Sequence, residues 1–258
     1  MTALAALQTA LRQRIGAAGE RPFAVLDFDN TCIVNDIAEA VLAHMCRNDL
    51  LRYRGLLARD TPPDEYPQRV FRHYYALLAQ GDIRAASLLC AALFAGYTRE
   101  EAAALVRATM DAEGNIPREG ELYGVPIAVG LAVRPALRAL SDFLRANAVE
   151  IWIVSASPEI AVQTAMQRLG LPGRLIALRN QMDGEVLSGQ VEEPCSIADG
   201  KVDCIRTFID AHRRPLLAVG DSIHDLPMIE YAEIGAAVDC DDGLADVARR
   251  RGWFVLPG

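Results

Sequence analysis

Short apolar runs and stretches of helical periodicity alternate over most of this chain. The apolar runs are residues 23–26, 151–154, 216–219 and 234–238, with a weaker run at 175–178. Runs of four or five apolar residues are typical of strands that are buried on both faces of a parallel sheet. Asp183-Gly184 lies between two short extended stretches and predicts a hairpin turn. The pattern therefore predicts an α/β fold, with helices on both faces of a parallel sheet.

The spacing of apolar residues also predicts where helices lie between these strands. The expected helices span residues 1–18, 135–146, 157–169 and 200–211. Pro135 suits the first position of its helix, and Asn147 and Gly170 suit the positions that end the second and third.

One long segment does not follow the alternation of helix and strand. From Asp36 to about Tyr123 the sequence has helical periodicity and almost no strand signal. This segment is long enough to have a hydrophobic core of its own. We therefore predict a sheet-containing core, residues 1–35 and 126–258, with a helical cap, residues 36–125, inserted after the first strand. Such an insertion would lie over one edge of the sheet as a lid.

Polar side chains follow three of the expected strands, at the point where each strand ends. Asp27 and Asp29 follow the first strand, Ser155 follows the second, and Asp221 comes soon after the third. The carboxyl ends of parallel strands meet at one edge of a sheet, where ligands of such folds bind. Carboxylates that close together repel one another unless a cation or a shared proton relieves the repulsion. The pattern therefore indicates a metal site or an acid–base site.

The residue types at this edge suit phosphate chemistry. Carboxylate oxygens suit a hard cation, and Mg²⁺ is the usual cation beside phosphates. The sequence shows no thiol-rich or imidazole-rich group for zinc. Lys201 can supply a positive charge to a phosphate oxygen, and Ser155 can supply a hydrogen-bond donor. One carboxylate could attack phosphorus while its neighbour carries the proton.

Composition narrows the classes of partner. The chain has 258 residues and a formal net charge of −8, which argues against nucleic acid as a partner. No apolar run is long enough to span a bilayer, and the amino-terminal segment lacks the basic start and unbroken apolar run of a signal peptide. The six cysteines have no CxxC spacing, which favours reduced core thiols in a cytoplasmic protein. The oligomeric state is left open.

Four sequence motifs resemble those of the haloacid dehalogenase superfamily, in the order of that family. They are Asp27-Phe28-Asp29-Asn30-Thr31, the Ile153-Val154-Ser155 strand end, Lys201, and Gly220-Asp221-Ser222 with Asp225. The resemblance spans about residues 23–238 and implies a Rossmann-like core and a Mg²⁺-dependent phosphatase with an aspartyl-phosphate intermediate.

The resemblance also implies a role for each motif residue. Asp27 is the nucleophile and a Mg²⁺ ligand, and Asp29 is the general acid and base that binds Mg²⁺ through its backbone carbonyl. Asp221 binds Mg²⁺, and Asp225 supports the ion or its waters; a plain alternative for Asp225 is capping of the helix that follows. The implied contacts to the transferring phosphoryl group come from Ser155, Lys201 and Asn30. Asp29 favours phosphate ester hydrolysis over dehalogenation, because dehalogenases of the family lack an aspartate two positions after the nucleophile.

The helical insertion resembles the cap of the phosphoserine phosphatase-like branch. In that branch a cap carboxylate nine positions after the nucleophile meets the substrate amine, and Asp36 has this spacing here. Asp36 could instead only cap the helix that begins at Ile37. The chain departs from the branch at residues 155–158, Ser-Ala-Ser-Pro, where phosphoserine phosphatase has a glycine pair after the serine. Relatives in the branch also act on phosphocholine, phosphoethanolamine and other small phosphomonoesters.

Tyrosines and phenylalanines concentrate in the insertion, where two roles are open to them. These residues are Tyr53, Tyr66, Phe71, Tyr74, Tyr75, Tyr97 and Tyr123. They could surround a quaternary ammonium group or form the core of the cap.

The sequence thus predicts an enzyme that hydrolyses a small, amine-bearing phosphate ester with Mg²⁺. A phosphotransferase or mutase, or a phosphatase for another small metabolite, is the alternative. A non-catalytic regulator that binds metal or phosphate on the same core is a more remote one.

Overall fold

The computed structural model describes residues 2–16, 21–58, 60–240 and 243–258. Its helices are α1 (Ala3–Ile15), α2 (Ile37–Arg47), α3 (Tyr66–Ala79), α4 (Ile83–Ala92), α5 (Arg99–Glu113), α6 (Pro135–Ala146), α7 (Glu159–Leu169), α8 (Gly200–Phe208), α9 (Leu226–Tyr231) and α10 (Leu244–Arg251). Its strands are β1 (Phe23–Leu26), β2 (Ile33–Val34), β3 (Arg118–Leu122), β4 (Val125–Val129), β5 (Ala132–Val133), β6 (Glu150–Pro158), β7 (Arg174–Leu178), β8 (Asn180–Asp183), β9 (Val186–Val191), β10 (Leu217–Gly220), β11 (Ile234–Val238) and β12 (Phe254–Leu256).

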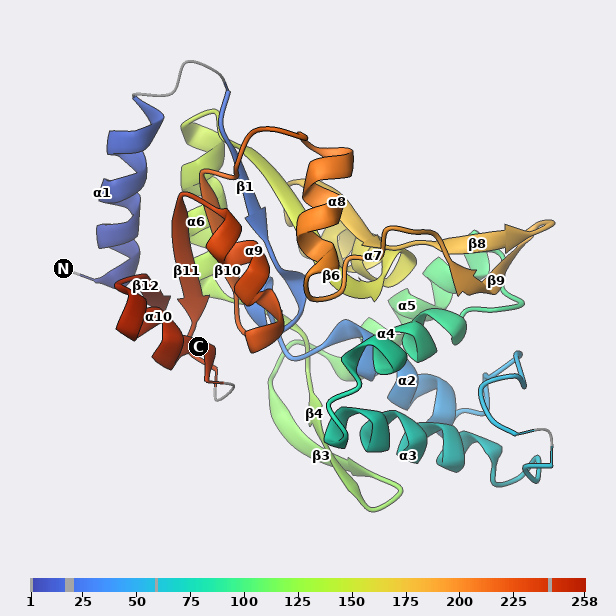
Figure 1. Cartoon of the computed structure of the whole chain (residues 1–258). Helices are drawn as coiled ribbons and strands as arrows, with labels where there is room; N and C mark the ends of the chain where they lie inside the picture. The colour runs from blue at the N-terminus through green and yellow to red at the C-terminus, as the bar shows by residue number, and fades with distance from the viewer. Residues whose placement is uncertain (1, 17–20, 59, 241–242) are drawn as a thin grey trace.

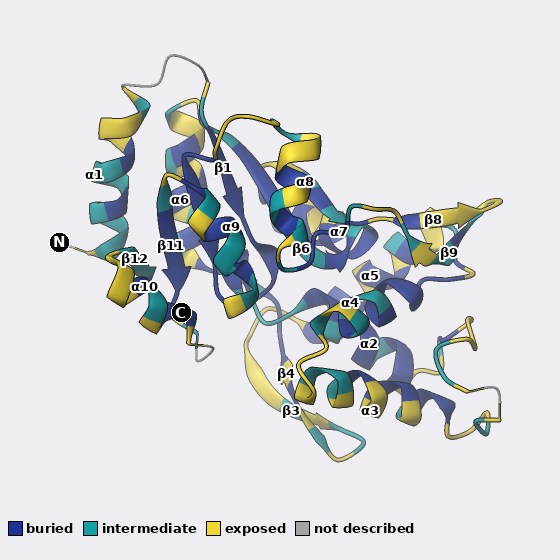
Figure 2. Cartoon of the chain, in the orientation of Figure 1, coloured by how far each residue is buried: buried dark blue, intermediate teal, exposed yellow. Residues whose placement is uncertain are grey.

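A six-stranded parallel sheet forms the centre of the molecule, in the order β12-β11-β10-β1-β6-β7 (Figure 1). Its strands are largely buried, whereas β3 and β8 are mostly exposed (Figure 2). The predicted α/β fold with a parallel sheet is confirmed. The sheet has one strand more than the sequence pattern predicted, β12, which is only three residues long.

Alternate residues of each central strand face opposite helical layers. In β1, Ala24 and Leu26 belong to a cluster that includes residues of α1, α6 and α7. Phe23 and Val25 belong to a second cluster, with residues of α8, α9 and α10. Successive side chains of a strand point to opposite faces, so an entirely apolar strand needs a helical layer on each side.

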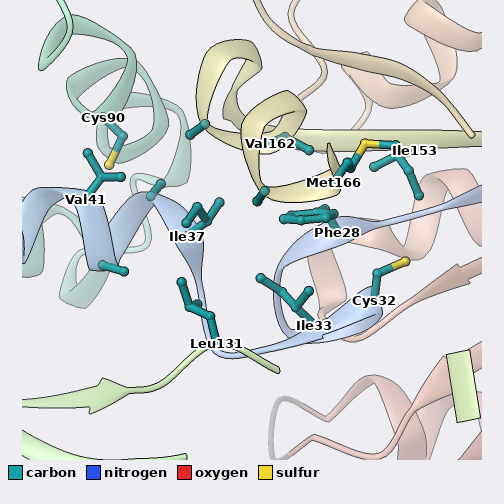
Figure 3. Close-up of a cluster of buried hydrophobic side chains, with 14 of the residues drawn as sticks. Phe28, Cys32, Ile33, Ile37, Val41, Cys90, Leu131, Ile153, Val162 and Met166 are labelled. Atoms are coloured by element: carbon teal, nitrogen blue, oxygen red, sulfur yellow. The ribbon is translucent and has the colours of Figure 1, made fainter. Parts of the chain in front are cut away.

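The insertion after β1 packs beyond the carboxyl ends of the strands and contains α2 to α5 (Figure 1). Its helices share one continuous hydrophobic cluster with the sheet core. Figure 3 shows part of this cluster, in which Val41 of α2 appears beside Cys90 of α4, and Ile37 of α2 appears on the side toward Phe28 from the turn after β1. This shared apolar cluster holds the insertion, including α2, against the core.

Two local predictions are wrong. The segment from Asp36 to Tyr123 is not free of strands, because β3 follows α5 and pairs with β4 in an antiparallel hairpin. Arg118, Glu119 and Glu121 of β3 are charged, so this exposed strand lacks the apolar run that predicts the buried strands. The strand β6 also continues past Ser155 to Pro158, so that α7 begins at Glu159.

A second hairpin, β8–β9, joins the core to the insertion. The backbone N–H of Gly96 donates to the carbonyl of Leu187 (2.9 Å), and the Leu187 N–H donates to the carbonyl of Tyr97 (2.8 Å). The buried side-chain amide of Asn180 donates to the carbonyls of Ala91 in α4 (2.8 Å) and Ser188 in β9 (2.9 Å). These bonds, together with the shared apolar cluster, tie the insertion to the core at a second place.

Five of the six cysteines, namely Cys32, Cys46, Cys90, Cys195 and Cys204, are buried, as expected for core thiols. Cys240 is only partly buried. Within the described ranges, no helix combines the length and apolar content that crossing a bilayer would need.

We expect Asn180→Ala to lower the free energy of unfolding by about 1–3 kcal/mol, because the substitution leaves two largely buried carbonyls without their donor. Denaturant titration followed by circular dichroism measures this change. The matched control is Asn115→Ala, at an exposed residue beyond α5. Equal stability of the two variants would contradict a joining role for Asn180.

Candidate active site

The chain makes a tight turn directly after β1, and this turn places the first motif. The Asp27 N–H donates to the carbonyl of Val219 in β10 (2.9 Å), so Asp27 continues the sheet register. Asn30 then takes a left-handed conformation (φ 52°). The guanidinium of Arg134 donates to the Asn30 carbonyl (2.9 Å), and the fully buried Phe28 ring anchors the turn in the core. The turn is therefore held from both its polar and its apolar side.

Three carboxylates from separate segments meet at the end of β1. Asp27, Asp221 and Asp225 are buried, and each has an oxygen within 4.8 Å of an oxygen of the other two. The Thr31 hydroxyl donates to Asp221 Oδ1 (2.7 Å). Asp225 accepts from the backbone N–H groups of Asp221 (3.1 Å) and Ser222 through Oδ2, so it also caps its own turn.

Lys201 lies against two of these carboxylates. Its Nζ donates to Asp27 Oδ1 (2.6 Å) and to Asp225 Oδ1 (2.5 Å), and its side chain is buried. Burial alone would lower the pKa of the ammonium group, but the charges of Asp225 and Asp27 outweigh burial and raise it. Lys201 is also the only lysine in the sequence; every other basic side chain besides the histidines is arginine.

The three carboxylates suit a divalent cation. Burial raises the pKa of Asp27 to about 7, with Lys201 opposing the shift and Asp225 adding to it. Burial and the charges of Asp27 and Asp225 raise the pKa of Asp221 to about 9. When all three carboxylates are ionised, one ammonium group leaves two negative charges uncompensated. A donor set of carboxylate oxygens with this charge fits Mg²⁺, and no thiol or imidazole belongs to it.

Asp29 lies outside this trio and is surrounded by hydrogen-bond donors. Its Oδ1 accepts from the Ile37 N–H at the start of α2 (2.7 Å), and its Oδ2 accepts from the hydroxyls of Ser157 (2.7 Å) and Ser155 (3.3 Å). Burial, followed by the charge of Asp36, nevertheless raises the pKa of Asp29 to about 8. A carboxyl group with such a pKa can carry a proton at neutral pH and give it up later.

Ser157 was not among the predicted site residues. Its hydroxyl contacts Asp29, and its N–H donates to the Ser155 hydroxyl (3.0 Å). Ser157 also lines the cavity described below, whereas Ser155 is fully buried behind it. The period of two along a strand could have revealed Ser157, because residues 155 and 157 share one face once β6 is extended to Pro158.

A cavity of about 460 Å³ opens beside these groups, between the core and the insertion. On the core side it is lined by Asp27, Asp29, Asn30, Ala156, Ser157, Ala198, Lys201, Asp221, Ser222, His224, Asp225 and Cys240. On the insertion side it is lined by Asp36, Ala38, Glu39, Tyr74, Leu78, Ile83, Ala86, Ser87 and Cys90. Seven of the eight predicted site residues thus line one cavity, and the eighth, Ser155, lies directly behind it.

Asp36 combines the two roles that the sequence left open. Its Oδ1 accepts from the N–H groups of Ala38 (2.6 Å) and Glu39 (2.9 Å), so it is the N-cap of α2. It also lines the cavity. Burial and the nearby charge of Glu39 raise the pKa of Asp36 to about 7.

The aromatic residues of the insertion serve mostly as its core. Phe71, Tyr75 and Tyr123 pack ring against ring, and Tyr66 bonds the backbone of Tyr53 and Leu56. In the part of the chain that the structure describes, Tyr74 is the one aromatic side chain lining the cavity. Of the acidic residues after β11, Asp239 pairs with Arg249, and Asp241 and Asp242 lie outside the described residues.

Comparisons with known proteins agree with this arrangement. A family model described as haloacid dehalogenase-like hydrolase matches residues 24–230. The phosphoserine phosphatase SerB1 of Mycobacterium tuberculosis is 28% identical over 109 residues, which cover 41% of this chain and 35% of that protein. The match therefore spans about a third of the mycobacterial relative.

Two other similarities extend over most of the chain. The phosphorylcholine phosphatase of Pseudomonas aeruginosa is 26% identical over 255 residues, which cover 80% of this chain and 69% of that protein. A solved structure of a phospho-aspartyl intermediate analogue of phosphoserine phosphatase has a TM-score of 0.57 and 14% identity, covering 92% of this chain and 93% of that one. At that identity the similarity establishes a shared fold.

The single lysine allows a direct check of the buried ion pair. We expect amine-reactive acylating reagents to modify Lys201 at least about 10-fold more slowly in the folded protein than in urea, because the group is buried and held protonated. Peptide mass spectrometry at several reaction times measures the rate. Equal rates in the folded and unfolded protein would contradict the geometry described above.

Proposed function

The chain belongs to the haloacid dehalogenase-like hydrolase family, and from this premise we propose that it hydrolyses small phosphate monoesters through a phosphorylated Asp27. The observation that carries the proposal is the meeting of Asp27, Asp29, Lys201 and Asp221 at one cavity. Three separate segments of the chain deliver these groups, and the mutual repulsion of the carboxylates is costly without a ligand to relieve it.

In the first step an Asp27 carboxylate oxygen attacks phosphorus, and the bond from phosphorus to the ester oxygen breaks. Asp29 gives its proton to the leaving alkoxide, which departs as an alcohol; its raised pKa suits this role. Lys201 would contact the phosphoryl oxygens from its place beside Asp27. Ser155 and the backbone of Asn30 would hold the group from the other sides.

In the second step water attacks the phosphorus of the aspartyl-phosphate. Asp29, now ionised, takes a proton from this water, and the bond between Asp27 and phosphorus breaks. Inorganic phosphate leaves, and both carboxyl groups return to their first state. Asp27, Asp221 and Asp225, with the backbone carbonyl of Asp29, would hold Mg²⁺, which supplies positive charge to the phosphate oxygens.

The segment of residues 36–125 would act as the cap that selects the substrate. The cavity volume suits a small molecule. Asp36 would face a positively charged group of that substrate, and both named relatives act on phosphate esters that carry an amine or ammonium group. We therefore infer a substrate of the phosphoserine, phosphocholine or phosphoethanolamine kind.

We expect Asp27→Asn to lower the turnover of a generic aryl phosphate by about 10³-fold or more, since the amide cannot act as the nucleophile. Steady-state release of phosphate measures the loss. Asp142→Asn, the same change at an exposed residue of α6, is the matched control. If the Asp27 variant kept its activity while folded, another residue would have to be the nucleophile.

Removing divalent cations with a chelator should abolish activity, and adding Mg²⁺ should restore it. Binding to the folded state should also raise the midpoint of thermal unfolding, by roughly 5–8 °C at a Mg²⁺ concentration 100 times its Kd. Calorimetric scans of the wild type and of Asp221→Asn, at several Mg²⁺ concentrations, test this point. A midpoint that Mg²⁺ does not change in the wild type would argue against the site.

A further inference from the structure

The insertion side of the cavity contains a carboxylate besides Asp36, that of Glu39, which has no role in the chemistry described above. Glu39 lies on α2, one turn after Asp36, and both line the cavity. The walls around them are mostly apolar and come from α3 and α4: Leu78, Ile83, Ala86 and Cys90. A carboxylate on such a wall is costly unless it has a partner.

Two tyrosines hold Glu39 in place. The Tyr74 hydroxyl donates to Glu39 Oε1 (3.0 Å), and the Tyr75 hydroxyl donates to Oε2 (3.3 Å). The two rings pack edge to face, with 5.2 Å between centroids, and Tyr74 is buried. Glu39 is thus fixed by neutral donors, which orient its carboxylate without neutralising it.

Negative charge dominates this side of the cavity. Among the described residues that line it, Lys201 and His224 are the side chains able to carry positive charge, and both belong to the core side. Lys201 is already paired with Asp27 and Asp225. Burial raises the pKa of Glu39, and the charge of Glu39 contributes to the raised pKa of Asp36. A bound cation would relieve the repulsion between the carboxylates of Glu39 and Asp36, whereas these two groups would repel a carboxylate of the ligand.

From this geometry we propose that Glu39 and Asp36 together bind a cationic head group that has no carboxylate. The preferred substrate is then a phosphorylated amino alcohol, such as phosphoethanolamine or phosphocholine, rather than a phosphorylated amino acid. This inference rests on the proposed phosphatase function and names the substrate class of the same site. Glu39 supplies charge, the apolar walls surround the head group, and Tyr74 and Tyr75 are positioning residues for Glu39.

Phosphoethanolamine and phosphoserine make a direct test, because they differ by one carboxylate. In the wild type with Mg²⁺, we expect kcat/KM for phosphoethanolamine to exceed that for phosphoserine by about 100-fold or more. Glu39→Gln keeps the shape of the side chain and its acceptor oxygen but removes the charge. It should lower kcat/KM for phosphoethanolamine by about 10-fold or more, mainly by raising KM. The ratio of kcat/KM for phosphoethanolamine to kcat/KM for phosphoserine should therefore decrease.

Two controls separate a binding role from a structural one. Glu121→Gln, an exposed residue of β3, makes the same chemical change away from the cavity. Calorimetric titration of phosphoethanolamine into Asp27→Asn, with and without Glu39→Gln, measures binding without turnover and should show the same loss of affinity. The wild-type comparison of the two esters needs no variant, so the inference is testable even if Glu39→Gln does not fold.

The possible outcomes separate a failure of the inferred substrate class from a failure of the proposed phosphatase function. Wild-type activity on an aryl phosphate with equal kcat/KM for phosphoethanolamine and phosphoserine would overturn the inference and leave the phosphatase function intact. A uniform loss in Glu39→Gln for every ester would assign Glu39 a structural role and overturn it as well. No hydrolysis of any ester in the presence of Mg²⁺ would instead overturn the proposed function.

Discussion

The contact of Lys201 with Asp27 and Asp225 is the interaction on which the arrangement of the active site depends. Three buried carboxylates within a few ångströms of one another would separate or take up protons if no cation were present. The lysine ammonium offsets part of their repulsion, and its four-carbon stem fills space in the core. Removing one partner of such a buried pair typically costs about 3–5 kcal/mol, because the other charge is left unpaired. The strand ends and α8 are thereby held together by charge as well as by packing.

The remaining negative charge explains why the site suits a divalent cation, which would in turn attract a phosphoryl group. One ammonium does not balance three carboxylates, and burial, together with the charges of the neighbouring carboxylates, raises the pKa values of Asp27 and Asp221. Asp29 is removed from the trio and receives three hydrogen bonds, yet burial keeps its pKa high. Two aspartates that are two residues apart therefore have different surroundings, and this difference suits the proposed roles of Asp27 as nucleophile and Asp29 as acid–base group.

Packing places the insertion over this site. The apolar cluster runs without a break from β1 through Phe28 and Ile37 to α2 (Figure 3). Asp36 caps α2, and one turn later Glu39 points to the tyrosines of α3. The same short segment thus connects the turn that contains Asp27 and Asp29 to the two carboxylates that line the insertion side of the cavity. A change in how α2 packs would move both sides of the site together.

The sequence by itself determined the parallel sheet and the position of its site. Apolar strands that end in Asp27, Ser155 and Asp221 must deliver those side chains to one edge, because all parallel strands end on the same side. Local signals of that kind need no knowledge of distant contacts. Only the tertiary structure decided which side chains contact one another at the site. That Ser157 joins Ser155 on Asp29, and that Tyr74 and Tyr75 bond Glu39, follows from contacts between distant segments. Such contacts depend on how segments that are far apart in the chain pack in three dimensions, and local sequence patterns do not specify that packing.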